Sequence, residues 1–116
     1  MIKGSGIDIV EVKRLEAAVK RWGDVFLKRV FTEKELAYSK NKRYPFVHLA
    51  ARFAAKEAVF KALGTNPKLN FKDIEISNDQ HGRPYCTIKN KVTPILLSIS
   101  HTYEYAVASA IIQKKA

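Results

Sequence analysis

The apolar residues in the first third of the chain follow two different spacings. Residues 2–10 are mostly apolar, with two glycines at which another backbone can approach closely, and they predict a strand. Apolar side chains then recur at helical spacing over 11–22, and a second short helix is expected over 24–30. Thr32 and Glu35 have the Ser/Thr-x-x-Glu spacing of a capping box, which predicts a third helix of about two turns.

The longest helix is expected over 45–64. Proline is favoured at the first position of a helix and glycine just past its last residue, and Pro45 and Gly64 stand at these two places. A loop over 65–71 and a polar turn over 79–84 then separate shorter segments. These predict strands over 72–78, 85–90, 95–101 and 104–113. Helices between one early strand and a C-terminal antiparallel group predict an α+β fold.

One acidic residue falls in the middle of the apolar side of the long helix, the side that should face the core. At about 100° per residue, Glu57 lies within about 60° of Phe46, Phe53 and Phe60. A buried carboxylate is costly unless it is paired, hydrogen-bonded, protonated or bound to a metal. Lys61, one turn further on, offers a structural ion pair, and the other interpretation of Glu57 is a functional acid.

Asp8 is a second acid in an apolar setting, because it interrupts the run Ile7–Asp8–Ile9–Val10. An aspartate is unfavourable inside a strand, although one at a strand end can simply cap a turn. Two carboxylates from separate elements suit a hard cation such as Mg²⁺, which keeps waters and takes phosphate oxygens as its other ligands. They are too few for a calcium cage built by the protein alone, and a glycosidase-type acid pair is a second use.

The charge of the chain favours a phosphate ligand over a sugar. It has 21 Lys and Arg against 11 Asp and Glu, a net charge of +10, which indicates an anionic partner such as nucleic acid, a phosphorylated ligand, an acidic protein or a membrane surface.

The single cysteine, Cys86, excludes an intrachain disulfide and a four-cysteine zinc site, and we expect it to be a small core side chain. No stretch approaches the ~20 apolar residues that span a bilayer. The first ten residues lack the apolar region of a signal peptide, so a cytoplasmic protein is expected.

A further candidate group lies at the end of a predicted strand. His101 stands between Ser100 and Thr102, and hydroxyl groups and imidazole all bind phosphate well. A lone histidine is also often a satisfied structural residue. Neither the nucleophile elbow G-x-S-x-G nor the P-loop G-x-x-x-x-G-K-[ST] occurs, which argues against a serine hydrolase and excludes a P-loop nucleotide enzyme.

Five segments of the chain, taken together, resemble a known family. They are GIDIVEVKRLE (6–16), FTEKELAY (31–38), RFAAKEAVFKALG (52–64), HGRPY (81–85) and SISHTYEYAVA (98–108). Their order and spacing are similar to those of holo-acyl-carrier-protein synthase, a 4′-phosphopantetheinyl transferase, over essentially the whole chain. The resemblance implies a single phosphopantetheinyl transferase domain over 1–116, with an antiparallel sheet packed against a long central helix.

The resemblance also implies an activity. Family members transfer the phosphopantetheine arm of coenzyme A to a serine of apo acyl carrier protein, in fatty acid biosynthesis, and release adenosine 3′,5′-bisphosphate. By match to the family's motifs, the catalytic residues would be Asp8 and Glu57, as magnesium ligands, and Lys61, which would contact the pyrophosphate and protonate the leaving phosphate. Val10 stands where larger relatives carry a further acid, so water is expected at that coordination position. The proton of the carrier's serine would go to Glu57 or to a magnesium-bound water.

Contacts with coenzyme A and with the carrier are implied as well. The residues expected to bind coenzyme A are Arg52, Lys56, Lys61, Ser100, His101 and Thr102. Arg14, Ala18, Arg21 and Val25 are spaced by four, three and four residues, which predicts a basic stripe on the first helix. We expect Arg14 and Arg21 to bind the acidic carrier protein, against the alternative of a solvated basic face. Single-domain members assemble as homotrimers with sites between subunits, so His101 would serve a neighbour's two acids.

A small basic RNA-binding module is the alternative from another class. It explains the charge of +10 and the 10% of aromatic residues equally well. It gives no reason for acids at core-facing positions, and the chain has no RNP-type or Gly-x-x-Gly motif. We therefore expect apo acyl carrier protein and coenzyme A as partners, and neither nucleic acid nor membrane.

Overall fold

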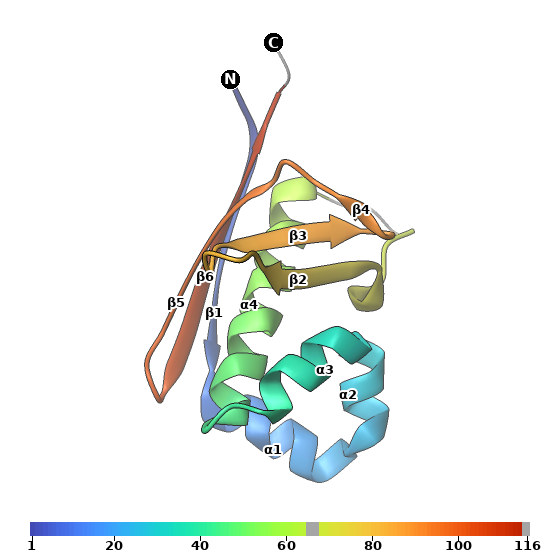
Figure 1. Ribbon diagram of the computed structural model, residues 1–116, viewed down its shortest axis with the longest axis vertical. Coiled ribbons are helices and arrows are strands. Elements are labelled where there is room, and N and C mark those ends of the chain that lie inside the picture. The colour runs from blue at the N-terminus through green and yellow to red at the C-terminus, as the bar shows by residue number, and fades with distance from the viewer. Residues whose placement is uncertain (65–67, 115–116) are drawn as a thin grey trace.

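The computed structural model describes residues 1–64 and 68–114 and has an α+β architecture (Figure 1). The helices are α1 (Val12–Trp22), α2 (Asp24–Val30), α3 (Glu33–Lys40) and α4 (Pro45–Leu63), followed by a 3₁₀ turn, η1 (Phe71–Asp73). The strands are β1 (Ile2–Glu11), β2 (Ile74–Asn78), β3 (Pro84–Ile88), β4 (Lys91–Val92), β5 (Leu96–His101) and β6 (Tyr105–Gln113). The predicted fold class is confirmed.

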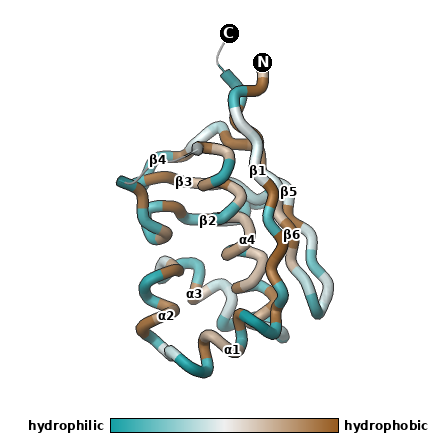
Figure 2. The backbone as a smooth tube through the Cα atoms, turned by 180° about the vertical axis from the view of Figure 1, so that it is seen from behind, coloured by the Kyte–Doolittle hydropathy of each residue, from teal (hydrophilic) through white to brown (hydrophobic). Residues whose placement is uncertain are grey.

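In the described part of the chain, two antiparallel sheets lie on different sides of α4. The first has the strand order β1–β6–β5, so the first strand pairs with the last, and the second has the order β2–β3–β4. Figure 2 shows, from behind, the first sheet along one side of α4 and the second sheet on the other. The helices α1, α2 and α3 lie around the N-terminal half of α4 (Figure 1). The prediction of an antiparallel sheet packed against a long central helix is confirmed.

The contact between β1 and α4 is unusually close. A Cβ atom at Gly6 would overlap the carbonyl oxygen of Ala58, and one at Gly4 would overlap that of Ala62. The facing side of α4 carries small side chains for the same reason, and Ala54 and Ala58 are fully buried there. Glycine on the strand and alanine on the helix therefore bring β1 within backbone contact of α4, as the sequence pattern predicts for the two glycines.

The buried side of α4 is not the stripe that the helical wheel predicts. Phe53, Phe60 and Glu57 are half-buried, whereas Val59 and the alanines facing β1 have no exposed surface. Two sheets and three helices enclose α4 from several directions, so no single apolar stripe defines the core. The prediction that Glu57 lies in the middle of the core-facing side is therefore wrong, and it lies at the edge of that side.

Local turns account for the differences at the strand ends. β2 begins at Ile74, two residues later than predicted, because Phe71–Asp73 form η1. β3 ends at Ile88 because Lys89 and Asn90 take positive φ angles of 49° and 68° and lead into the short strand β4, which no sequence pattern predicts. The predicted loop 65–71 lies partly outside the described residues.

The first two helices divide at Gly23, whose φ of 60° ends α1. Val25 therefore lies in α2, so the predicted stripe spans two helices instead of one. Cys86 is fully buried in β3, as expected, and burial raises the pKa of its thiol to about 11. Within residues 1–64 and 68–114, no helix combines the length and the apolar character needed to cross a membrane.

Candidate active site

Asp8 faces α4 because β1 turns alternate side chains toward the helix and away from it. Ile7 and Ile9 lie on the outer face and are 65% and 63% exposed. The side chain of Asp8 points the other way and is only 18% exposed. The strand thus holds a carboxylate against the long helix.

Lys61 lies on α4 beside this carboxylate. Its Nζ donates to Asp8 Oδ1 over 3.2 Å and to the carbonyl oxygen of Ile7 over 2.9 Å. Among the residues that the structure describes, the ion pair of Lys61 is with Asp8 and not with Glu57. The interpretation of Glu57 as the structural partner of Lys61 is therefore wrong.

Glu57 lies one turn before Lys61 on α4 and interacts electrostatically with Asp8. Partial burial, and then the negative charge of Asp8, raise the pKa of Glu57 above its ordinary value, while Lys61 opposes the rise. The two carboxylates therefore repel each other across the junction of β1 and α4. A divalent cation bound by both would remove this repulsion, and carboxylate oxygens are ligands that Mg²⁺ prefers.

Glu57 borders two hollows in the surface. One has a volume of about 340 Å³, and Asp8 and Arg14 also line it. The other has a volume of about 730 Å³ and lies between Glu57, Arg29 and Phe71. In residues 1–64 and 68–114, no group of three or more His, Cys, Asp or Glu side chains is placed to hold a metal ion. A metal bound by the two carboxylates would therefore complete its shell with water and substrate oxygens.

The His101 group lies apart from the two carboxylates. The ring of His101, at the end of β5, packs edge to face against the ring of His48 in α4, with 5.4 Å between their centres. Both rings and Thr102 line a separate hollow of about 430 Å³. Ser100 is exposed on the outer face of the first sheet. One chain therefore does not bring these residues together with Asp8 and Glu57.

Arg52 lies on the same side of α4 as the two histidines. It is 4% exposed, its Nη2 donates to Asn78 Oδ1 over 2.8 Å, and its guanidinium lies 3.8 Å from the centre of the Tyr38 ring. Its Nε has no hydrogen-bond partner among the described residues. Burial, and then the charges of His101, Lys42 and Arg52, lower the pKa of His48. The positive charges of Lys42 and Arg52 therefore lie near the His48 ring and favour its neutral form. No sequence pattern singles out His48 as part of this group.

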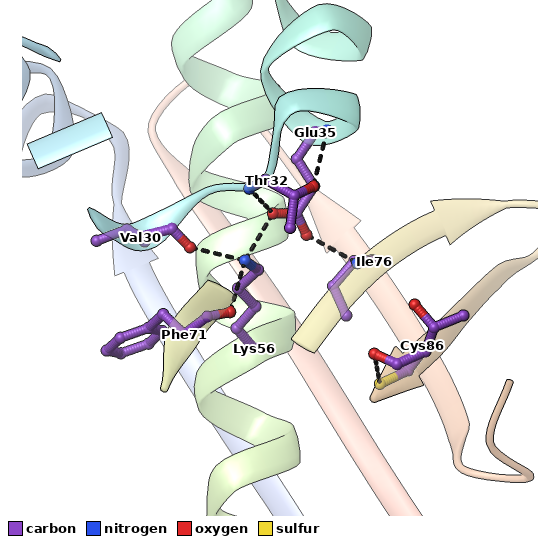
Figure 3. Close-up of polar contacts among 8 residues, drawn as sticks. Val30, Thr32, Glu35, Lys56, Phe71, Ile76 and Cys86 are labelled. Carbon is purple, nitrogen blue, oxygen red and sulfur yellow. Dashed lines mark hydrogen bonds and ion pairs between the residues drawn. The ribbon is translucent and has the colours of Figure 1, made fainter. Parts of the chain in front are cut away.

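Lys56 has no exposed surface. Its Nζ lies 2.6 Å from Glu35 Oε1 and donates to the carbonyl oxygens of Val30 and Phe71 over 2.7 Å and 2.9 Å (Figure 3). An ammonium group has three donors, and all three are used inside the protein. Lys56 therefore has no donor left for coenzyme A, against the expectation from the resemblance. The sequence signal for this interior role is a lysine that follows two alanines of the core helix.

One basic residue of α1 lies beside the carboxylates, and another lies further along the helix. Arg14 lines the same hollow as Asp8. The guanidinium of Arg21 lies 5.0 Å from the centre of the Trp22 ring, and Trp22 and Val25 are 58% and 66% exposed. The predicted basic stripe thus carries two exposed apolar side chains where α1 meets α2.

Comparison with known proteins shows the family to which the chain belongs. Residues 4–111 match the family model of the 4′-phosphopantetheinyl transferase superfamily. The holo-[acyl-carrier-protein] synthase of Protochlamydia amoebophila is 46% identical over 119 residues, which cover 96% of this chain and 98% of that protein. The crystal structure of the synthase from Neisseria meningitidis has a TM-score of 0.88 at 33% identity and covers 98% of this chain and 100% of its own. The synthase structure from Bacillus anthracis has a TM-score of 0.80 at 39% identity and covers 96% of both chains.

The chain belongs to the 4′-phosphopantetheinyl transferase superfamily and, within it, to the holo-[acyl-carrier-protein] synthase family of enzymes. The resemblance carried by the five sequence segments is confirmed.

Proposed function

We propose that this chain transfers the 4′-phosphopantetheine moiety of coenzyme A to a serine of apo acyl carrier protein, and that the reaction depends on magnesium and releases adenosine 3′,5′-bisphosphate. The observation that carries this proposal is the pairing of Asp8 and Glu57 across β1 and α4, with Lys61 beside them. The Bacillus anthracis synthase, solved in complex with CoA (3′,5′-ADP), supports the choice of substrate. Residues 1–116 would act as one such domain, in the cytoplasm and in fatty acid biosynthesis.

Asp8 and Glu57 would hold the magnesium ion. Their carboxylate oxygens, and the repulsion between them, fit a hard divalent cation. Val10 lines the same hollow without offering a ligand atom, so water would complete the shell there. When bound, magnesium supplies a Lewis acid and a template at the pyrophosphate of coenzyme A.

Lys61 would be the mobile cation of the site. Phosphoryl transfer asks a protein mainly for positioning and for neutralisation of charge. The side chain of Lys61 is 53% exposed, so its bond to Asp8 competes with water and is readily exchanged. Its Nζ would turn from Asp8 Oδ1 to the pyrophosphate and give a proton to the leaving phosphate.

The outer face of the first sheet supports assembly as a homotrimer. Ile7 and Ile9 are exposed on β1, and Leu96 is 53% exposed on β5. Their cross-strand neighbours on this face are uncharged: Ser109 and Ser98 beside Ile7, Val107 and Ser100 beside Ile9, and Ile111 beside Leu96. This uncharged patch, which lies between Lys3 and Glu11 on β1, suits contact between copies of a chain of charge +10.

Such an assembly would complete the site. Ser100, His101 and Thr102 of one subunit would bind the ADP end of coenzyme A beside the two carboxylates of its neighbour. Arg52 would add positive charge behind this end. The separation of the two groups within one chain supports sites shared between subunits.

The carrier protein would dock on α1 and the start of α2. Arg14 lies at the rim of the carboxylate hollow, and Arg21 lies further along α1 beside exposed Trp22 and Val25. Basic side chains around exposed apolar ones suit the face of an acidic helix. This surface would bring the carrier's serine to Asp8 and Glu57.

The test is incubation of the chain with coenzyme A, Mg²⁺ and apo acyl carrier protein, followed by mass spectrometry of the carrier. We expect a mass gain of one phosphopantetheine, which disappears when a chelator is added. Asp8→Ala should abolish the gain while the circular dichroism spectrum stays that of the folded chain, because a metal ligand is not a packing residue. No mass gain with any of several carriers would contradict the proposal, and RNA binding that survives chelation would favour the RNA-binding alternative.

A further inference from the structure

The buried ion pair between Glu35 and Lys56 has no part in the function proposed above. Both side chains have no exposed surface. Glu35 also accepts from the backbone N–H of Thr32 over 2.9 Å and from that of Ile76 over 2.7 Å (Figure 3). Burial raises the pKa of Glu35 and lowers that of Lys56, so it works against both charges. Buried ion pairs are often no more stabilising than apolar residues of similar size, so stability alone does not explain this one.

Two acceptors of Lys56, Val30 and Phe71, belong to elements that line the larger hollow beside Glu57. Lys56 directly precedes Glu57 on α4. Its acceptor Val30 directly follows Arg29 at the end of α2, and its acceptor Phe71 is part of η1. Glu57, Arg29 and Phe71 all line the hollow of about 730 Å³. One ammonium group therefore ties together the three elements that form this hollow.

The same contacts fix the rotation of α4 about its own axis. The three acceptors come from α2, α3 and η1, so α4 cannot turn or slide without breaking a charge-assisted hydrogen bond away from water. The ring of Phe71 adds contacts to α4, at 5.6 Å from Phe53 and 5.1 Å from Phe60. A side chain roughly 5–6 Å from the helix axis moves by about 1 Å for each 10° of rotation. An error of about 1 Å in a reacting group can cost on the order of 100-fold in rate.

We propose that Lys56, held in place by Glu35, is a positioning residue. It sets the direction in which the Glu57 side chain points, by fixing the rotation of α4 and the position of η1. The proposal rests on the proposed function, because it concerns the direction of a group in that site. It differs from a purely stabilising role in one respect: activity should depend on the pair even among molecules that are fully folded. It also gives Lys56 a role that needs no contact with coenzyme A.

Three variants separate positioning from stability. Lys56→Met removes the ammonium and leaves Glu35 buried without a counter-charge. The double variant Glu35→Gln/Lys56→Met removes both charges, so it should recover much of the lost stability without restoring the three-acceptor contact. Ile74→Ala is the control, because Ile74 is fully buried in β2 and its loss destabilises the chain through a cavity. If Lys56→Met fails to fold, the test is the comparison of the double variant with Ile74→Ala.

The measurements are kcat, the two KM values and the Tm with and without Mg²⁺, at a temperature where each variant is fully folded. We expect kcat of the double variant to be about 10–100-fold lower, with the KM for coenzyme A and for the carrier within about threefold of the unaltered chain. The rise of Tm on adding Mg²⁺ should shrink in the double variant and stay unchanged in Ile74→Ala. Equal kcat and equal magnesium shifts in the double variant and in Ile74→Ala would show that the pair is only structural.

Failure of this proposal is distinguishable from failure of the proposed function. If the unaltered chain transfers phosphopantetheine and the double variant does so at the rate of the control, only the positioning role is overturned. If the unaltered chain transfers nothing, hydrogen exchange still tests the positioning. Amides of residues 56–61 and of Phe71–Asp73 should then exchange faster in the double variant than in Ile74→Ala at equal global stability. Equal exchange would overturn the positioning role in that case.

Discussion

At the scale of single residues, the carboxylate of Glu57 is repelled by the charge of Asp8. Its pKa in the folded chain is raised above the ordinary value of 4.5, by burial and by Asp8. The folded state therefore holds the proton of Glu57 more tightly than the unfolded state does. It follows that the free energy of unfolding falls as the pH rises from the ordinary value through the raised one. The cost is fully present at a pH above the raised value.

Glu57→Gln should therefore separate stability from activity. At pH 7 without metal, the Tm of this variant should equal or exceed that of the unaltered chain, because the repulsion with Asp8 is gone. The transfer rate should collapse, and the rise of Tm on adding Mg²⁺ should disappear, because Glu57 is one of the two proposed metal ligands. Calorimetry with and without Mg²⁺, together with the mass assay, measures all three effects.

Glu33→Gln is the matched control for this variant. It removes the same charge from an exposed position on α3, and should leave the transfer rate and the magnesium shift unchanged. Any gain in Tm for Glu57→Gln should fade as the pH falls to the ordinary value of 4.5. A clear loss of metal-free Tm with activity retained would instead give Glu57 a structural role.

The sequence predicts the acids of the site better than it predicts their partners. Asp8 and Glu57 stand out because a carboxylate is unexpected in an apolar run or stripe. Lys61 is a different case, because the spacing rule for helix ion pairs considers only residues on one helix. Its actual partner, Asp8, lies on β1, more than 50 residues away in the chain. Contacts of that kind depend on packing, so the residue pattern does not reveal them.

At the scale of elements, the contact between β1 and α4 sets the distance between the two carboxylates. Gly6→Ala should disturb this contact, because the new Cβ would overlap the backbone oxygen of Ala58 and lie 2.8 Å from the backbone nitrogen of Ala62. Backbone atoms of a packed helix cannot move aside as a flexible side chain can. We expect a loss of about 1–3 kcal/mol or more in the free energy of unfolding, measured by urea titration.

The transfer rate of the same variant should fall as well, because the strand that carries Asp8 is pushed away from the helix that carries Glu57. Lys91→Ala, at an exposed position on β4, is the control and should change stability by no more than about 0.5 kcal/mol. A Gly6→Ala variant as stable and as active as the control would mean that β1 and α4 tolerate separation.

Element ends were predictable where they depend on neighbouring residues and not where they depend on packing. The capping box of Thr32 and Glu35 is present, Pro45 opens α4, and Gly64 ends it. These signals act within one turn of a helix, so the sequence contains them directly. The burial of α4 depends instead on what surrounds it. A wheel that ranks phenylalanine above alanine therefore misplaces the centre of the buried side, since close contact with β1 requires the smaller side chain.

At the scale of the whole molecule, the two halves of the proposed site lie on different parts of one chain. Asp8, Glu57 and Lys61 lie where β1 meets α4, and His101 lies at the end of β5 beside another hollow. An exposed patch of uncharged side chains on the first sheet offers a surface through which copies could bring the halves together. The net charge of +10 favours the acidic carrier whichever way the copies assemble.

Complementation between inactive variants tests whether the halves come from different subunits. Asp8→Ala and His101→Ala, each prepared alone, should transfer little or nothing. In a cyclic trimer, each site would take Asp8 from one subunit and His101 from its neighbour. When the two variants are unfolded together in equal amounts and refolded, about a quarter of the sites should combine an intact Asp8 with an intact His101. The mass assay should then recover roughly a quarter of the activity of the unaltered chain taken through the same procedure. Light scattering should give the mass of a trimer for the refolded mixture. If the refolded mixture has the mass of a trimer but recovers no activity, Asp8 and His101 of each site would come from the same subunit.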